Sequence, residues 1–210
     1  MYIPTAFKVD ELEVLHNLMQ AYNFATLVTC QAGTPFATHL PFMVHPQQGQ
    51  YGTLVAHMAR ANPQWHYFNT DTEVLVIFQG PHTYISPSWY TSEFSVPTWN
   101  YAAVHAYGIP RLIEDPAALQ QALDELVQHH EEPRTPPWTF EWSERHVNLT
   151  KAIVAFEITI TRLEGKLKLS QNRSAEDRLG VIHGLSHSPA KSDRAVAALM
   201  VAPAQAKATD

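Results

Sequence analysis

The sequence FATLVTCQAGTPFATHLPFMV, residues 24–44, is the stretch that decides the fold most directly. Two runs rich in β-branched, aromatic and other apolar residues, 24–30 and 35–44, flank the four residues Gln31-Ala32-Gly33-Thr34. A short connection that contains glycine, placed between two such runs, is typical of a β-hairpin. The stretch therefore predicts two neighbouring antiparallel strands.

Further runs predict strands that continue this antiparallel order. They cover residues 53–57, 73–79, 82–86, 98–113 and 152–163. Gly80-Pro81 separates the second run from the third, and Pro110 indicates a sheet edge or a bulge near the end of the fourth. Because strands and helices do not alternate strictly, a doubly wound sheet is disfavoured. The pattern predicts a mainly β, α+β fold with flanking helices, in which an antiparallel sheet closes into a barrel.

Helix signals occur before, between and after these strands. Leucines at helical spacing after Asp10 predict a first helix that ends at about Ala21. Asp115-Pro116 is typical of an N-cap followed by a first-turn proline. We predict further helices at about 115–130, at 143–151 with Ser143 as the cap, after Ser174, and over 193–200.

The length of 210 residues suits one domain with a single core. We expect this domain to span residues 1–180, with the helices at about 115–130 and 143–151 inserted into it. Residues 181–210 are expected to form a C-terminal helical tail that is partly disordered, because its end is rich in alanine.

Composition restricts the cellular setting and the class of partner. The net charge of −6 and the pI near 6.0 do not predict the basic surface that binds nucleic-acid phosphates. No segment has the run of about eighteen apolar residues that a membrane span needs. The N-terminus lacks the features of a signal peptide, and the lone Cys30 cannot form an intrachain disulfide. We expect a cytoplasmic protein without membrane contact, for which direct DNA binding has little support.

The segment HMARANPQW, residues 57–65, contains the parts of a phosphate site. Asn62-Pro63 predicts the N-cap and first position of a short helix, whose free N–H groups favour anions. Arg60 can add a bidentate guanidinium. The alternative is a surface turn with a solvated arginine.

Gln79, at the end of a predicted strand, has an amide that suits the polar edge of a flavin ring. Nearby aromatic residues can either line a slot for that ring or pack in the core.

Other chemistries find weaker support. The histidines on or near strands, His39, His57, His82 and His105, lack the spacing of a zinc motif, so we predict no metal site. Cys30 ends an apolar strand without a neighbour that lowers its pKa, which indicates an inert thiol rather than a nucleophile. No Gly-x-Ser-x-Gly motif presents a hydrolase serine. No catalytic residue can be assigned.

Six longer segments together carry a family resemblance. They are MYIPTAF at 1–7, HLPF at 39–42, HMARANPQW at 57–65, VIFQGPHTYISPSWY at 76–90, VPTWNYAAVHAYG at 96–108 and LEGKLKLSQNR at 163–173. On these segments the chain resembles the PaiB family of FMN-binding negative transcriptional regulators. They lie in the same order along most of residues 1–180, which makes the resemblance more specific than any single short motif.

The resemblance implies a split-barrel fold, related to pyridoxamine-phosphate oxidases and flavin reductases, with FMN in a cleft shared by the two subunits of a homodimer. It implies that the segment from His57 through Arg60 and Asn62 takes the phosphate and that Gln79 faces the isoalloxazine. Thr38 and His39 would line the pocket. A second group of candidate FMN-binding residues comes from the last segment: Lys168, Ser170 and Gln171.

Several functions remain open at this point. The family implies a negative transcriptional regulator, but the sequence shows neither a helix-turn-helix nor a basic recognition helix. Regulation can therefore act directly or through flavin-dependent chemistry. The alternatives are an FMN-dependent oxidoreductase, a flavin reductase or a haem-handling relative of the same barrel, and, less favoured, a binding module without flavin.

Overall fold

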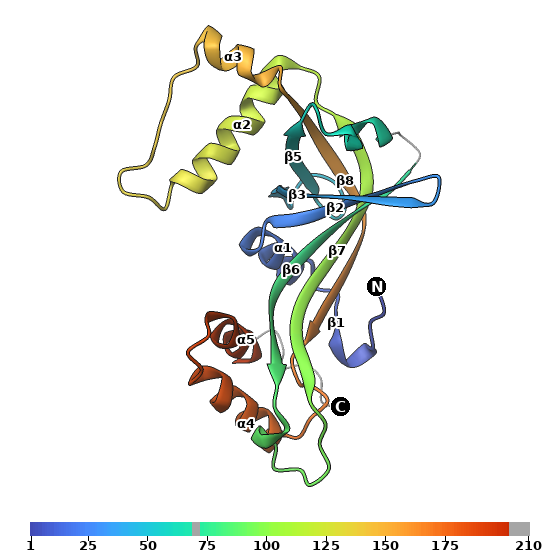
Figure 1. The fold of residues 1–210 in the computed structure, drawn as a ribbon, viewed down its shortest axis with the longest axis vertical. Coiled ribbons are helices and arrows are strands. Elements are labelled where there is room, and N and C mark those ends of the chain that lie inside the picture. Colours follow the sequence, from blue (N-terminus) through green and yellow to red (C-terminus); the bar gives the residue numbers. More distant parts are fainter. Residues whose placement is uncertain (69–71, 202–210) are drawn as a thin grey trace. The chain divides into compact units, whose positions relative to one another are not determined.

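The computed structural model describes residues 1–68 and 72–201 of the chain (Figure 1). The strands are β1 (Lys8–Val9), β2 (Phe24–Gln31), β3 (Thr34–Pro41), β4 (Met43–His45), β5 (Thr53–Ala59), β6 (Val74–Ile85), β7 (Thr98–Leu112) and β8 (Ile153–Lys168). The α-helices are α1 (Leu12–Ala21), α2 (Pro116–Glu131), α3 (Glu144–Thr150), α4 (Ala175–Ser186) and α5 (Lys191–Val201). Short 3-10 helices are η1 (Thr5–Phe7), η2 (Pro63–Tyr67) and η3 (Pro87–Trp89).

The strands form one eight-stranded sheet in the order β3-β2-β6-β7-β8-β5-β4, with β1 paired to β8 off this path. The registers that define β1–β8, β2–β3, β2–β6, β4–β5 and β5–β8 are all antiparallel. The prediction of a mainly antiparallel β fold with flanking helices is thus confirmed. Within the described residues, the hydrogen-bonded path ends at β3 and at β4. The sheet is therefore not closed, whereas the succession of strands in the sequence predicted a closed barrel.

The chain divides into two compact units. The first contains Met1–Leu18, Gln79–His105 and Glu164–Asp210, and the second contains Met19–Phe78 and Ala106–Leu163. The long strands β6, β7 and β8 each contribute residues to both units, whereas β2 to β5 belong to the second unit alone. The expected division at residue 180 falls inside α4.

The predicted hairpin is confirmed and forms part of the second unit. Phe24 pairs with Pro41 and Gln31 with Thr34, which leaves Ala32 and Gly33 as the two turn residues. Both have positive φ, 49° and 80°, as a two-residue hairpin turn requires. The predicted second strand breaks at Phe42, whose buried ring meets Phe78 and Phe156 edge to face in the core.

The inserted helices begin where their caps predict. The Asp115 carboxylate accepts a hydrogen bond from the Ala118 N–H at 2.9 Å at the start of α2. Ser143 caps α3 as the first residue of a capping box. The helix predicted after Asp10 is also present, although α1 begins at Leu12. None of the helices in the described ranges is long and apolar enough to cross a membrane.

The two strands predicted at 73–79 and 82–86 are one strand, β6, and this prediction was wrong. At Gly80-Pro81 the chain continues but the alternation shifts, since Gln79 is exposed and the next exposed side chain is His82. Such a shift is typical of a β-bulge. Pro81 is tolerated because β2 pairs only with residues 75–77 of β6, so the missing N–H does not interrupt that ladder.

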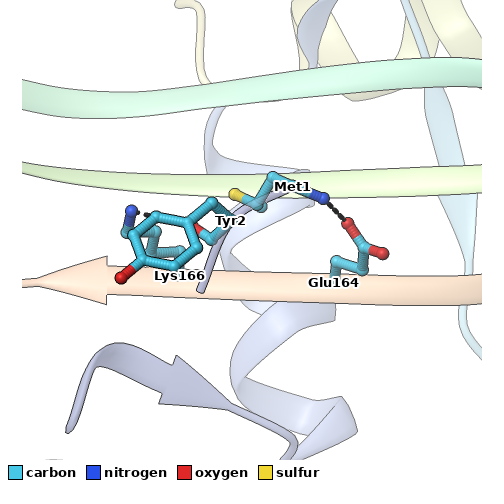
Figure 2. A network of polar contacts seen from close by, with 4 residues as sticks. All are labelled: Met1, Tyr2, Glu164 and Lys166. Carbon is cyan, nitrogen blue, oxygen red and sulfur yellow. Dashed lines mark hydrogen bonds and ion pairs between the residues drawn. The ribbon is translucent and has the colours of Figure 1, made fainter. Parts of the chain in front are cut away.

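In the first unit, the N-terminal segment is tied to β8 (Figure 2). The Met1 ammonium pairs with the Glu164 carboxylate, and Lys166 Nζ donates to the Tyr2 carbonyl at 3.0 Å. The C-terminal helices α4 and α5 follow β8, and each places apolar side chains in the core: Val181, Leu185, Val196, Ala197 and Met200. The frayed C-terminal end predicted by the sequence lies in 202–210, outside the described residues.

Candidate functional site

The loop after β5 contains two of the predicted binding residues, Arg60 and Asn62. Asn62 is the N-cap of η2, as predicted, and its Oδ1 accepts a hydrogen bond from the Gln64 N–H at 3.0 Å. Its Nδ2 donates to Thr38 Oγ1 on β3 at 2.9 Å. The structure thus brings Asn62 and Thr38 together. The predicted anion site needs free N–H groups at the start of a helix. Helix η2 is a 3-10 helix of five residues, and its first N–H is already bonded to the cap, so it offers an anion few free donors.

Arg60 lies exposed just before this helix, and its guanidinium is held in place. Nε donates to the Lys151 carbonyl and Nη2 to the Ile153 carbonyl, both at 2.8 Å. Within the described residues Nη1 makes no hydrogen bond. Arg60 therefore has a structural role at the start of β8, which the sequence did not predict, and retains one nitrogen that can donate to an anion.

Gln64 is a residue that sequence reasoning missed, although it lies in the quoted HMARANPQW segment. Its side chain is fully buried, and Nε2 lies 3.2 Å from each of three acceptors, the Leu27 and Phe36 carbonyls and Thr29 Oγ1. These bonds fix η2 against the β2–β3 hairpin. Its buried Oε1 has no partner among the described residues. A glutamine between Pro63 and Trp65 in η2 was the available signal.

Thr38 and His39 lie on opposite faces of β3, because successive side chains of a strand alternate. Thr38 contacts the loop that carries Asn62, whereas His39 is exposed and its Nδ1 lies 2.9 Å from Thr26 Oγ1. The His39 ring stacks on Phe24. The two residues therefore do not line the same face of the hairpin.

His57 points toward the inserted helix α2. It lines a small space together with Ala122, Leu123 and Leu126 of that helix. Burial lowers the pKa of His57 below its ordinary value of 6.5, because the charged imidazolium loses its hydration there. His57 is therefore a neutral, packed side chain near neutral pH.

The first unit contains the other predicted residues, of which Lys168 alone carries a charge. Its ammonium donates to Thr98 Oγ1 and to the Trp99 carbonyl. Burial, followed by the positive charges of Lys166 and Arg173, lowers the pKa of Lys168. Lys166 and Arg173 were not among the predicted residues, although both occur in the LEGKLKLSQNR segment, and Lys166 shares a face of β8 with Lys168.

Aromatic rings surround this basic cluster. Lys166 lies over the rings of Tyr2 and Tyr101, Lys168 over Phe7, and Arg173 over Tyr90. Cations beside aromatic faces are stabilised without a carboxylate partner. The rings therefore offset part of the repulsion among the three cations, and the cluster is a second candidate site for an anion.

Ser170 and Gln171 shape the turn that ends β8. Ser170 is buried with φ of 62°, and its hydroxyl accepts a hydrogen bond from Asn100 Nδ2 at 2.9 Å. The Gln171 Oε1 accepts from the Leu169 N–H at 2.7 Å, and its Nε2 donates to the Leu167 carbonyl. The polar groups of both side chains are thus used by the local backbone and by Asn100.

Gln79 is exposed at the bulge in β6, and its Nε2 lies 3.3 Å from His82 Nδ1. The ring of His82 is in turn 6.3 Å from that of Trp99 on β7. The amide nitrogen is thus in contact with His82, while Gln79 Oε1 makes no hydrogen bond among the described residues and can meet a ligand on this face. Over residues 1–68 and 72–201, no three His, Cys, Asp or Glu side chains form a group that can hold a metal ion.

Comparison with known proteins adds a family to this geometry. Residues 1–162 match the family described as "Putative FMN-binding domain". The chain is 40% identical over 204 residues to the Bacillus subtilis protein named "Protease synthase and sporulation protein PAI 2". That alignment covers 95% of this chain and 96% of the relative.

Solved structures show the same fold at low sequence identity. The FAD and heme binding protein from Mycobacterium smegmatis has a TM-score of 0.62 at 18% identity, covering 82% of this chain and 78% of that one. The flavocytochrome Anf3 from Azotobacter vinelandii has a TM-score of 0.57 at 16% identity, covering 77% and 69%. The antiparallel sheet and its flanking helices therefore form a split barrel of the flavin-binding type, as the sequence predicted.

Proposed function

The chain belongs to the FMN-binding domain family, and from this we propose that it is an FMN-binding negative transcriptional regulator of the PaiB type. The observation that carries the proposal is 40% identity to the Bacillus subtilis PAI 2 protein over nearly the whole of both chains. We propose that it acts in the cytoplasm. When bound, FMN supplies redox chemistry, while the protein binds and orients it.

The second unit offers donors that fit the phosphate end of FMN. Arg60 is exposed, its guanidinium plane is already held by two carbonyls, and Nη1 is available among the described residues. Asn62, two residues after Arg60, donates to Thr38 Oγ1, and the Thr38 hydroxyl proton can still be donated outward. A guanidinium that is oriented before binding loses little freedom when it meets a phosphate. We propose that Arg60 binds the phosphate, with Asn62 and Thr38 beside it.

The experiment is an FMN titration of wild-type protein, Arg60→Ala and Lys168→Ala, followed by quenching of flavin fluorescence. Loss of a charge-assisted hydrogen bond costs about 1.5–3 kcal/mol, so Arg60→Ala should raise the Kd roughly tenfold to a hundredfold. The matched control is Arg111→Ala, which removes an exposed arginine at the end of β7. Its Kd should equal that of the wild type.

The Lys168 variant separates two placements of the phosphate. An unchanged Kd in Arg60→Ala together with a large loss in Lys168→Ala would move the phosphate to the basic cluster of the first unit. Because Arg60 also holds the start of β8, the unfolding transition of each variant must be measured alongside. A flavin titration without any saturation in the wild type would overturn FMN binding itself.

Direct repression needs a surface that binds DNA, and the chain offers little charge for one. Helices α4 and α5 are consecutive and joined by residues 187–190, but α5 has only two basic residues, Lys191 and Arg194, against Asp193. The Asp193 carboxylate accepts a hydrogen bond from Thr83, and Arg194 donates to the Ser188 carbonyl. We therefore propose that regulation acts through the flavin rather than through a basic recognition helix.

Two assays on the FMN-loaded protein test the mode of regulation. One measures flavin reduction by NADH and NADPH, and the other measures retardation of promoter DNA at moderate salt. Turnover without retardation supports regulation through flavin chemistry. Tight, sequence-selective retardation would instead show direct repression.

A further inference from the structure

Helix α2 and the long connection that leads to α3 both belong to the second unit (Figure 1). A cavity lies between them, and none of the proposed phosphate residues lines it. Its volume is about 370 Å³, which is within the range of small-molecule sites. One wall is a face of α2 and the other is the connection. The residues that line it are Asp124, Val127, Gln128, Glu131, Glu132, Pro137, Trp138, Thr139 and Phe140.

Specific bonds hold the two walls of this cavity together. Trp142 Nε1 donates to Asp124 Oδ1 at 2.8 Å, and the Trp138 backbone N–H donates to Glu131 Oε2 at 2.9 Å. The Trp138 and Phe140 rings stack with their centroids 5.1 Å apart. The cavity is therefore a formed feature of the unit, although Trp138 is 57% exposed.

The carboxylates around the cavity are only partly neutralised. Glu131 pairs with Arg134 at 3.3 Å. Asp124 and Glu132 have no cationic partner among the described residues. From residue 116 to residue 150 the sequence has six acidic residues and two basic ones, so this region holds much of the chain's net negative charge. An anionic ligand is disfavoured here by charge alone.

Aromatic faces beside unpaired carboxylates are the combination that recognises an organic cation. The ammonium group is attracted by the ring quadrupole and by the carboxylates, while its apolar body covers ring surface. A neutral apolar ligand would remove water from the carboxylates without pairing them, which costs free energy. We propose that this cavity binds a small organic amine, with the ammonium beside the Glu132 carboxylate and its apolar part against Trp138 and Phe140.

The test uses three ligands of one shape and three charges: phenethylamine, 2-phenylethanol and phenylacetate. Each is titrated into the FMN-loaded, ¹⁵N-labelled protein, and the indole N–H signals are followed. The signal of Trp142 reports on the cavity because its indole donates to Asp124. We expect phenethylamine to bind about threefold to tenfold more tightly than the alcohol, and phenylacetate most weakly.

Two variants locate the interaction. Glu132→Gln keeps the side-chain shape and removes the charge, so it should weaken phenethylamine binding about threefold without changing the affinity for the alcohol. Trp138→Leu should weaken the binding of both ligands. It should also remove the part of the preference for the amine that comes from the cation–ring interaction. Glu93→Gln, an exposed carboxylate of the other unit, is the matched control and should leave all affinities unchanged.

The proposal is overturned by equal affinities for the amine and the alcohol, by indole shifts confined to tryptophans other than Trp138 and Trp142, or by an unchanged preference in Glu132→Gln and Trp138→Leu. Backbone amide spectra of each variant establish that the unit is still folded. FMN content is measured in parallel, so that failure of the amine site is distinguishable from loss of the flavin.

Discussion

At the scale of single residues, His57 is a predicted FMN-binding residue that packs against a helix instead of facing solvent. It packs beneath α2 against Leu123 and Leu126, and burial lowers its pKa below 6.5. The folded protein therefore resists protonation of His57, whereas the unfolded chain accepts the proton at its ordinary pKa. Stability consequently falls as the pH drops below about 6.5 toward the lowered folded pKa, and it is restored above 6.5.

Replacement of His57 by glutamine should remove this contribution. We expect the free energy of unfolding of wild-type protein to fall more between pH 7.5 and pH 5.5 than that of His57→Gln. Urea denaturation at both pH values, in protein without FMN, measures the difference. His129→Gln, which removes an exposed histidine of α2, serves as the control and should keep the wild-type pH dependence. An identical pH dependence in His57→Gln would show that the imidazole is not buried.

At the scale of elements, α4 lies close to η3 because two glycines face it. A Cβ at Gly180 would lie 2.0 Å from the Trp89 carbonyl oxygen, and one at Gly184 would lie 2.5 Å from the Trp89 ring. In addition, the buried Asp177 carboxylate accepts hydrogen bonds from the backbone and side chains of Thr91 and Ser92. The helix is thus held to the loop after β6 by close approach and by a satisfied buried charge.

Gly180→Ala tests this close approach. Alanine favours a helix over glycine by about 1 kcal/mol, but here its methyl group meets backbone, and overpacking costs about 1–3 kcal/mol. We expect the clash to dominate, so that the free energy of unfolding measured in urea decreases. Leu179→Ala removes a neighbouring side chain that is 66% exposed and should have little effect. A gain in stability in Gly180→Ala would mean that α4 does not pack on η3.

At the scale of the whole molecule, large apolar side chains of the first unit remain exposed. Trp99 is 54% exposed and Tyr84 46%, and their rings meet edge to face. Apolar side chains that gather on a surface mark interaction sites. We propose that this surface contacts a second copy of the chain in a homodimer with the flavin between subunits.

The oligomeric state is measured by gel filtration with light scattering. Wild-type protein should elute as a dimer, and Trp99→Glu should shift it toward the monomer because a buried unpaired carboxylate is costly in an interface. The control is Phe24→Glu, which places the same charge on an aromatic residue that is 67% exposed in the other unit. A wild-type monomer, or a dimer that persists in Trp99→Glu, contradicts the proposal.

Much of the local structure follows from the sequence, because its causes act over a few residues. The hairpin turn at Ala32-Gly33, the caps of Asn62, Asp115 and Ser143, and the antiparallel β character could all be predicted. Turn and cap preferences depend on backbone conformation and on hydrogen bonds within one turn. The family also follows from the sequence, since long ordered segments match it.

Tertiary structure alone decided how the predicted residues are used. The Gly80-Pro81 pair predicted a strand break but lies at a bulge inside β6. The strand continues past this pair because β6 is hydrogen-bonded to its neighbour β7 in the sheet. Arg60 reads as a free phosphate ligand, yet two of its nitrogens bond to carbonyls about ninety residues away in the chain. The unpredicted partners, Gln64, Lys166 and Arg173, belong to contacts made across the fold. Such contacts depend on which distant segments the chain brings together, and no local pattern of residues specifies that.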